Sequence, residues 1–186
     1  MGAQNKLLLP WRDGEPILRH VVQAALAWGP AEVVVVVRPD LFAMAGALAG
    51  LPVRLVGNPA WEAGMGTSLS AGIAALGPEI AAALVLLGDS PDVDPAIIHA
   101  LIAAYRATGL PIAMPFYGDD PGPPTLFARA VFADLMQLGG DTGGRVLVRH
   151  YPDRVARVAL PVSARPLDID TPEAYAAALA LRPSAG

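Results

Sequence analysis

Asp89 is the first residue of this chain whose position suggests chemistry. It lies two residues after the apolar run Ala82 to Leu87, within the segment Leu-Gly-Asp-Ser-Pro. A carboxylate at the carboxyl end of a buried strand is suited to hold a Mg²⁺ ion that carries phosphates. The same spacing also fits a turn that begins at Gly88-Asp89 and that the Asp89 side chain caps. The local sequence leaves both interpretations open.

A second acidic segment and a lysine complete the candidate set. Asp168 and Asp170 flank Ile169 and precede Thr171-Pro172-Glu173, so both carboxylates project to one side if the segment is extended. Asp170 could supply a second metal ligand or join the cap of the following helix, and spacing alone favours capping. Lys6 is the only lysine among 13 Lys and Arg residues. A lysine near the start of a chain is usually a solvated charge.

The segment Gly64 to Ser68, which contains glycines at positions 64 and 66, opens a predicted helix. The free N–H groups at such a helix start can bind an anion or the edge of a base. The segment is no dinucleotide fingerprint, because Leu69 occupies the place of the third glycine, and the chain has no phosphate-binding P-loop motif. His20, His99 and His150 lack metal-ligand spacing and are expected to be surface or packing residues. The absence of cysteine and of a Ser–His pair excludes thiolate chemistry and gives no support to a hydrolase triad.

These residues need a scaffold in which strands alternate with helices. Such alternation predicts an α/β fold, with a mostly parallel sheet, helices on both faces and a ligand site at the carboxyl ends of the strands. The predicted strands are 32–37, 53–56, 82–87, 112–114 and 155–160. The predicted helices are one that Pro16 opens and Gly29-Pro30 ends, then 40–48, 67–76, 95–108, 129–138, 142–151, and one that starts at Thr171-Pro172, with Thr171 as N-cap.

Composition narrows the possible classes of protein. With 186 residues, of which 54% are hydrophobic and 16% charged, the chain is expected to form one domain over residues 1–186 rather than a disordered segment. The net charge of −4 argues against a general nucleic-acid binder. The longest apolar run, Ile80 to Leu87, is far shorter than the ~20 residues that span a bilayer, and no secretory signal is visible. We therefore expect a cytoplasmic protein without a membrane partner.

Taken together, several blocks resemble one family, the molybdenum cofactor nucleotidyltransferases, and its cytidylyltransferase branch in particular. The resemblance extends from Met1 to about Leu181. The blocks, in the family's order, are K-L-L-L-P-W (6–11), N-P-A-W-E-A-G-M-G-T-S-L (58–69), L-G-D-S-P-D-V (87–93), L-G-G-D-T-G-G-R (138–145) and D-I-D-T-P-E (168–173).

The resemblance implies a Rossmann-like nucleotidyltransferase fold and Mg²⁺-dependent transfer of CMP from CTP to a phosphorylated molybdopterin-type acceptor, with release of pyrophosphate. It implies a molybdoenzyme or its chaperone as protein partner. It assigns Lys6 and Asp89 to catalysis and Asp89 and Asp170 to the metal. The implied nucleotide-binding residues are Gly2, Lys6, Asn58, Gly64, Met65 and Ser68. The implied acceptor-binding residues are Gly140, Asp141, Gly144 and Arg145.

The sequence departs from the family in two places. The family's first strand and glycine-rich turn precede the lysine, whereas Met1-Gly2 aligns with the end of that turn, so we expect an N-terminally truncated domain whose neighbouring strands lack a partner. Either the coding sequence starts upstream of Met1 or the phosphate loop is lost. In addition, Pro123 replaces a histidine of the family's Gly-His-Pro. Alternatives therefore remain: a related enzyme that uses GTP or a sugar phosphate, or a non-catalytic scaffold.

Overall fold

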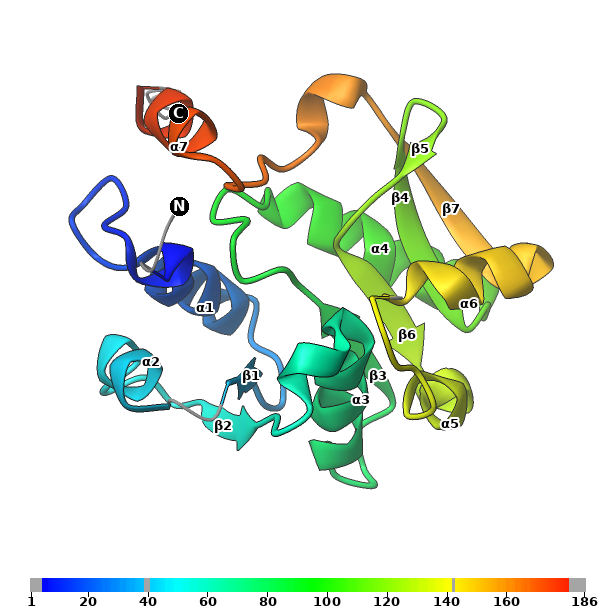
Figure 1. The fold of residues 1–186 in the computed structure, drawn as a ribbon. Coiled ribbons are helices and arrows are strands. Elements are labelled where there is room, and N and C mark those ends of the chain that lie inside the picture. The colour runs from blue at the N-terminus through cyan, green and yellow to red at the C-terminus, as the bar shows by residue number, and fades with distance from the viewer. Residues whose placement is uncertain (1–4, 39–40, 142, 181–186) are drawn as a thin grey trace.

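The structure, a computed structural model, describes residues 5–38, 41–141 and 143–180 (Figure 1). Its strands are β1 (Val34–Val37), β2 (Arg54–Gly57), β3 (Ala82–Val85), β4 (Ile112–Tyr117), β5 (Asp120–Pro121), β6 (Thr125–Ala128) and β7 (Val155–Leu160). Its α-helices are α1 (Ile17–Ala27), α2 (Leu41–Ala47), α3 (Met65–Ala75), α4 (Pro95–Thr108), α5 (Phe132–Leu135), α6 (Arg145–His150) and α7 (Pro172–Ala180). The 3-10 turns are η1 (Lys6–Leu8), η2 (Trp61–Ala63), η3 (Arg129–Val131), η4 (Pro152–Arg154) and η5 (Val162–Ala164).

The larger sheet is built around β4. One edge of β4 pairs in parallel with β7 over its whole length, whereas β6 and then the short β5 pair with it in antiparallel fashion. The order is β3-β6-β4-β5, with β7 on β4. Because β6 is antiparallel to both β3 and β4, the strands β3, β4 and β7 point the same way. The sheet is therefore mixed rather than uniformly parallel.

Helices cover both faces of this sheet, as the alternation of elements predicts. Ile112, Met114 and Phe116 of β4 pack against α3, α5 and α6, in a core that also contains Phe127. Ala113 and Tyr117 point to the opposite face and pack against α4. All six residues of β4 are buried, which explains why charged residues are absent from this strand.

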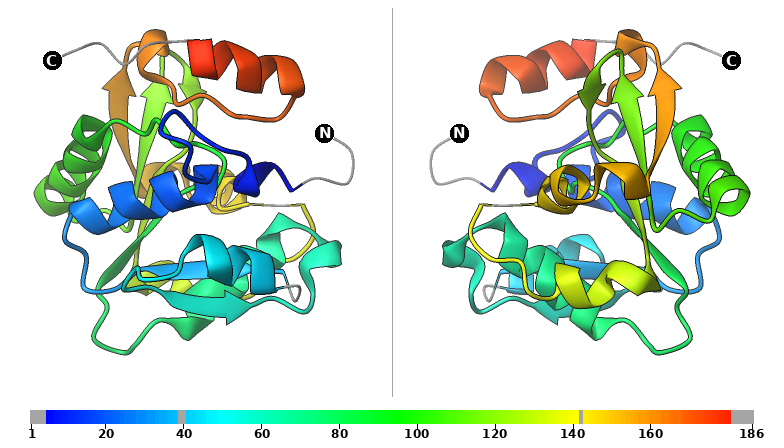
Figure 2. Two further views of the ribbon diagram at one scale, coloured as in Figure 1. Left: turned by 90° about the vertical axis from the view of Figure 1, so that its left-hand side faces the viewer. Right: turned by 90° about the vertical axis from the view of Figure 1, so that its right-hand side faces the viewer.

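The smaller sheet pairs β1 and β2 in parallel. Val35 and Val37 of β1 pack on α1 and α2. On the other side of the strand lies α3, where a Cβ on Gly72 would come within 3.0 Å of Val36 Cγ2. Helix α3 also contributes Ile73 to the core of the larger sheet. It thus bridges the two sheets, as Figures 1 and 2 show from three sides.

No strand of the described residues pairs with the second edge of β1 or of β3. All four residues of β3 are only half-buried, although Ala82–Val85 belongs to one of the most apolar stretches of the chain. By contrast, β4 and β6 are buried throughout. The incomplete burial of β3 follows from its position, because it has a neighbour on one side only.

Most predicted elements are present, with different boundaries. The predicted strand 155–160 and helix 95–108 coincide with β7 and α4. Predicted helix 142–151 is shorter and begins at Arg145, and predicted helix 129–138 is divided into η3 and α5. Strands β5 and β6 were not predicted. Their segment, 120–128, is short and contains three prolines, which usually mark turns rather than strands.

Candidate functional site

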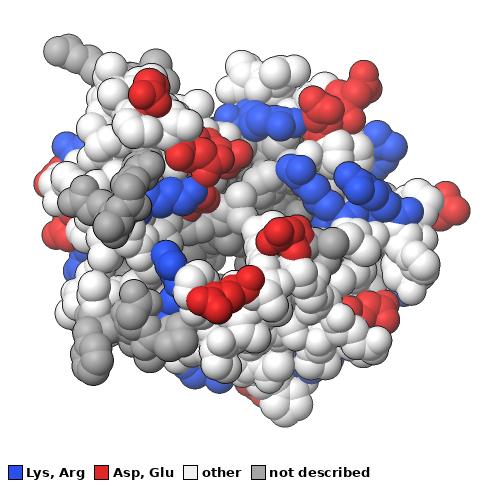
Figure 3. Space-filling view, in the orientation of Figure 1, with Lys and Arg blue, Asp and Glu red and all other residues white. Residues whose placement is uncertain are grey.

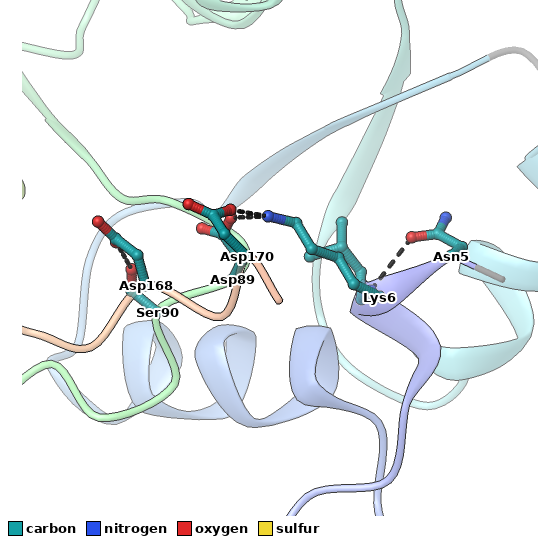
Figure 4. A network of polar contacts seen from close by, with 7 residues as sticks. Asn5, Lys6, Asp89, Ser90, Asp168 and Asp170 are labelled. Carbon is teal, nitrogen blue, oxygen red and sulfur yellow. Dashed lines mark hydrogen bonds and ion pairs between the residues drawn. The ribbon is translucent and has the colours of Figure 1, made fainter. Parts of the chain in front are cut away.

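Lys6 lies between two carboxylates that come from distant parts of the chain (Figure 4). Its Nζ donates to Asp89 Oδ2 at 2.5 Å and to Asp170 Oδ1 at 2.6 Å. Asn5 accepts a hydrogen bond from the Leu7 N–H at 3.1 Å and so caps η1, the turn that carries Lys6. Three candidate residues of the sequence analysis, Lys6, Asp89 and Asp170, thus lie together around one ammonium group. Lys6 is therefore not an isolated surface charge.

The two acidic segments also contact each other through their backbones. Ile169 N–H donates to the Asp89 carbonyl at 3.4 Å, and the Ile169 side chain is fully buried beside Trp11 and Ile17. On one side of Ile169, Asp168 accepts a hydrogen bond from the buried Ser90 hydroxyl at 3.2 Å. On the other side, Asp170 contacts Lys6. Burial of the isoleucine therefore turns both carboxylates toward the Asp89 segment.

Helix α7 does not use Asp170 as its cap. Thr171 Oγ1 accepts the Ala174 N–H at 3.1 Å, and Pro172 is the first helical residue. The capping role that spacing alone favoured for Asp170 is therefore wrong, and the predicted cap Thr171 is confirmed. Because the threonine hydroxyl satisfies the helix end, the Asp170 carboxylate stays available for a cation.

The surroundings of Lys6 favour its protonated, charged form. Desolvation by partial burial acts to lower the pKa of Lys6, but hydrogen bonds to Asp170 and Asp89 and their Coulombic attraction outweigh it and raise the pKa above its ordinary value. The lysine side chain is 30% exposed, Asp89 19% and Asp170 68%. The ammonium group can therefore meet an anionic ligand from the solvent side while it remains charged.

A cavity of about 370 Å³ opens beside this group. It lies at the carboxyl end of β1, where ligand sites of open α/β sheets are expected. We call it the Lys6 cavity, and its lining residues are Asn5, Lys6, Leu7, Val36, Val37, Arg38, Met44, Ser68 and Asp170. It thus contains three residues expected from the sequence, Lys6, Ser68 and Asp170. Sequence analysis missed Arg38, although its position directly after a predicted strand was a usable signal.

Asn58 is buried and its side chain serves the fold. Its amide donates to Thr67 Oγ1 at 2.8 Å and to Ser68 Oγ at 3.0 Å, and its carbonyl oxygen accepts the Ala60 N–H at 3.0 Å. Both amide hydrogens are therefore used to hold the first turn of α3. A direct contact of Asn58 with a nucleotide stays a prediction, and its observed contacts are those of a positioning residue.

The predicted nucleotide and acceptor segments lie against each other at Gly64. This glycine has a φ of +106°, and a Cβ built on it would lie 2.2 Å from the carbonyl carbon of Gly140 and 2.6 Å from Asp141 N. The Gly66 N–H donates to the Gly140 carbonyl at 2.9 Å. Residues that are more than 70 positions apart in the sequence thus form one continuous surface, which only glycine at position 64 permits.

The other residues predicted to bind the nucleotide or the acceptor lie in different parts of the structure. Gly144 packs on Phe127, where a Cβ would approach the ring to 2.4 Å, and Arg145 lines a second cavity. Met65 is 51% exposed at the start of α3. Gly2 lies outside the described residues. Figure 3 shows the face that carries these segments, with a hollow between the two halves of the molecule.

The donor set fits a divalent cation held together with a substrate. Asp89 and Asp170 already converge on one positive centre, at 2.5 and 2.6 Å. Within the described part of the chain, no group of three or more His, Cys, Asp or Glu side chains could hold a metal ion. Mg²⁺ is commonly bound by one or two carboxylates and completed by substrate phosphates, so a pair of aspartates is sufficient.

Comparison with known proteins identifies the class. The family of MobA-like NTP transferase domains matches residues 1–155, and the chain belongs to this family. Its fold is the Rossmann-like nucleotidyltransferase fold. None of the helices that the structure describes combines the length and apolar character needed to cross a bilayer.

Particular relatives share most of the chain. The Rv0371c protein of Mycobacterium tuberculosis H37Rv, solved in complex with manganese, is 29% identical, with a TM-score of 0.82 over 95% of this chain and 92% of that chain. A nucleotidyl transferase from Methanothermobacter thermautotrophicus is 25% identical, with a TM-score of 0.76 over 92% and 82% of the two chains. Nicotine blue oxidoreductase of Paenarthrobacter nicotinovorans is 29% identical over 93% of this chain and 87% of its own length.

The close contact at Gly64 predicts that one added methyl group lowers the stability of the protein strongly. Gly64→Ala should lower the free energy of unfolding by at least about 2 kcal/mol, because it adds backbone strain and a clash with Gly140. Gly109→Ala is the matched control, since Gly109 has a φ of +66° but no atom within 4 Å of its Cβ position. Urea unfolding should show a smaller loss for the control, and equal losses would refute the close contact.

The raised pKa of Lys6 predicts a loss of stability in alkali. In the unfolded chain the lysine deprotonates near pH 10.4, whereas the folded chain still holds the proton, so the contribution is complete below that pH and disappears as pH rises through the folded pKa. In chelator-treated protein, the unfolding free energy should fall between pH 9 and 12. The unfolding free energy of Lys6→Arg, whose guanidinium stays charged, should fall less over the same range. An identical pH dependence of the unfolding free energy in both proteins would contradict the prediction.

Proposed function

We propose that this protein is a Mg²⁺-dependent nucleotidyltransferase that transfers CMP from CTP to a phosphorylated molybdopterin-type acceptor and releases pyrophosphate. The observation that carries the proposal is the position of Lys6, held by Asp89 and Asp170 at the rim of a cavity. Two carboxylates for a cation and one ammonium for phosphate oxygens are the charges that such a transfer requires.

In the proposed reaction, an ionised phosphate oxygen of the acceptor attacks the α-phosphorus of CTP. The bond from that phosphorus to the bridging oxygen of pyrophosphate breaks in line, and pyrophosphate leaves with the electron pair. Lys6 donates hydrogen bonds to phosphate oxygens whose negative charge grows in the transition state. Because the attacking oxygen is already ionised, no side chain of the protein needs to remove a proton.

Asp89 and Asp170 would hold the metal ion in this mechanism. When bound, Mg²⁺ neutralises the phosphate oxygens and orients them for in-line displacement. The manganese complex of the Rv0371c protein supports a divalent ion in a relative of this chain. Lys6 occupies the space between the two carboxylates, so its ammonium group must move toward the phosphates when the carboxylates bind the metal.

The choice of CTP and of the acceptor rests on the sequence blocks that resemble the cytidylyltransferase branch. GTP as donor or a sugar phosphate as acceptor would use the same charges, so pyrophosphate release must be compared across all four nucleoside triphosphates. One relative bears the name of an oxidoreductase. We favour transfer over reduction because Lys6, Asp89 and Asp170 match phosphate chemistry, whereas the chain has no dinucleotide fingerprint.

Asp89→Asn should reduce metal-dependent pyrophosphate release by about 100-fold or more, because the neutral amide binds a hard cation poorly. The matched control is Asp94→Asn, five residues along. Asp94 caps α4 by accepting the Ala96 N–H at 2.8 Å, and asparagine caps a helix equally well. Pyrophosphate release should be measured by a coupled phosphate assay. Retained activity in Asp89→Asn would refute the metal assignment.

Competition between Lys6 and the metal gives a prediction that does not depend on turnover. Lys6→Met should bind Mn²⁺ about tenfold more tightly than the wild type without nucleotide, because two carboxylates then face no competing ammonium group. Lys6→Arg keeps the charge and should stay near the wild type. Electron paramagnetic resonance reports free Mn²⁺ directly. Weaker binding in Lys6→Met would show that the carboxylates do not hold the ion.

A further inference from the structure

Ser90 directly follows Asp89, and the proposed reaction gives it no role. The residue is 2% exposed, although serine is mostly found at protein surfaces. Its N–H donates to the Leu87 carbonyl at 3.3 Å, which closes the turn that carries Asp89. Within the described part of the chain, its hydroxyl has one hydrogen-bond partner, the Asp168 carboxylate at 3.2 Å. A buried hydroxyl thus joins the loop after β3 to the segment before α7.

This hydrogen bond is one of three polar links between the two segments. Next to it, the Ile169 N–H donates to the Asp89 carbonyl at 3.4 Å. Beyond that, Asp170 and Asp89 both accept hydrogen bonds from Lys6 Nζ, at 2.6 and 2.5 Å. The links therefore follow one another along residues 168–170, and the serine contact lies beside the lysine contacts in Figure 4.

The three links differ in what happens to them when a metal ion binds. In the proposed mechanism the Lys6 ammonium group leaves both carboxylates, so its ion pairs cannot hold Asp170 near Asp89 in the metal-bound protein. The serine hydrogen bond does not involve Lys6 and is kept. The Ile169 contact then fixes the middle of the segment and the serine contact fixes its start. Two fixed points determine the direction in which Asp170 is presented.

The serine gains more from this hydrogen bond than the aspartate does. Asp168 is exposed, so water can solvate its carboxylate when the contact opens. The Ser90 hydroxyl is buried, and a buried polar group without a partner is unfavourable. Ser90 therefore opposes any rotation that turns residues 168–170 away from the loop after β3. An amide oxygen at position 168 would accept the same hydrogen bond, so the contact requires an acceptor there rather than a charge.

We infer that Ser90 is a positioning residue, whose hydroxyl holds Asp168 so that the neighbouring Asp170 carboxylate faces Asp89. The inference deepens the proposed function, on which it rests for the divalent cation that the two carboxylates bind. Ser90 acts through the backbone of residues 168–170 and is not a ligand of the ion.

Mn²⁺ binding in the absence of nucleotide tests this role, with electron paramagnetic resonance as the readout of free ion. Ser90→Ala should weaken Mn²⁺ binding about fivefold, because Asp170 then faces Asp89 for less of the time. Asp168→Asn keeps an acceptor for the hydroxyl and should stay within about twofold of the wild type. Wild-type affinity in Ser90→Ala would overturn the inference, as would a large loss confined to Asp168→Asn, which would indicate a role of charge alone.

The matched control is Ser70→Ala. The Ser70 hydroxyl donates to the Met136 carbonyl at 2.7 Å and has no contact with residues 168–170. The control removes a hydroxyl and its hydrogen bond, and it should bind Mn²⁺ like the wild type. Equal weakening in Ser70→Ala and Ser90→Ala would reduce the effect to a general loss of stability and overturn the inference.

A double-mutant cycle tests whether Ser90 acts through Asp168. Asp168→Ala should weaken Mn²⁺ binding, and adding Ser90→Ala to it should weaken binding no further, because the hydrogen bond is already lost. An additional loss of about fivefold in the double variant would show that Ser90 acts by another route and would overturn the inference.

A metal-free measurement separates the inference from the proposed function. Lys6 is the only lysine of the chain, so ¹⁵N-lysine labelling gives a single Nζ signal. Its ammonium protons should exchange with water about threefold faster in Ser90→Ala, because Asp170 accepts them for less of the time. Unchanged exchange would overturn the inference. If the wild type binds no Mn²⁺, the proposed function fails, and ammonium exchange alone decides whether Ser90 positions Asp170.

Discussion

The ion pairs of Lys6 are the interaction on which the site depends. One ammonium group joins a turn near the start of the chain, the loop after β3 and the segment before α7. Lys6 belongs to the short 3-10 turn η1, whereas Asp89 and Asp170 lie outside helices and strands, so its ion pairs add to the burial of Ile169 in holding these segments together. The same three groups are those that phosphate and a divalent cation would use. The ion pairs that hold these segments together therefore compete with the binding of a phosphate or a cation by the same side chains. Functional sites often contain charged groups arranged in this way.

Glycine at position 64 sets a second constraint. It allows the first turn of α3 to pack closely against Gly140, whose carbonyl accepts the Gly66 N–H. Helix α3 also packs on both sheets, through Gly72 on β1 and Ile73 in the larger core. Helix α3, which supplies Ser68 to the Lys6 cavity, is thus held by both sheets and by Gly140.

Sequence reasoning located the elements that carry strong local signals. Valine runs, proline at a helix start and Thr171 before Pro172 each act over a few residues, and the structure confirms those elements. The assembly of Lys6, Asp89 and Asp170 was expected from family resemblance, because spacing alone left each of them with an ordinary alternative. The motif around Asn58 gave no sign that its amide turns inward to Thr67 and Ser68, and its contact with a nucleotide stays a prediction. Arg149 and Arg165 line the same cavity as Arg145 but carry no local signal in the sequence, because only the tertiary fold brings them together.

The open edges of β1 and β3 have a consequence for hydrogen exchange. Within the described residues each strand has a partner on one side, so every second amide of two very apolar strands lacks a ladder hydrogen bond. In most α/β proteins, such strands contain the slowest-exchanging amides of the molecule. In this protein, slow exchange should shift to β4, which has neighbours on both edges, while the valines of β1 exchange early. The same free amides and carbonyls form a template for an extended peptide, so concentration and temperature should govern how long the isolated chain stays in solution.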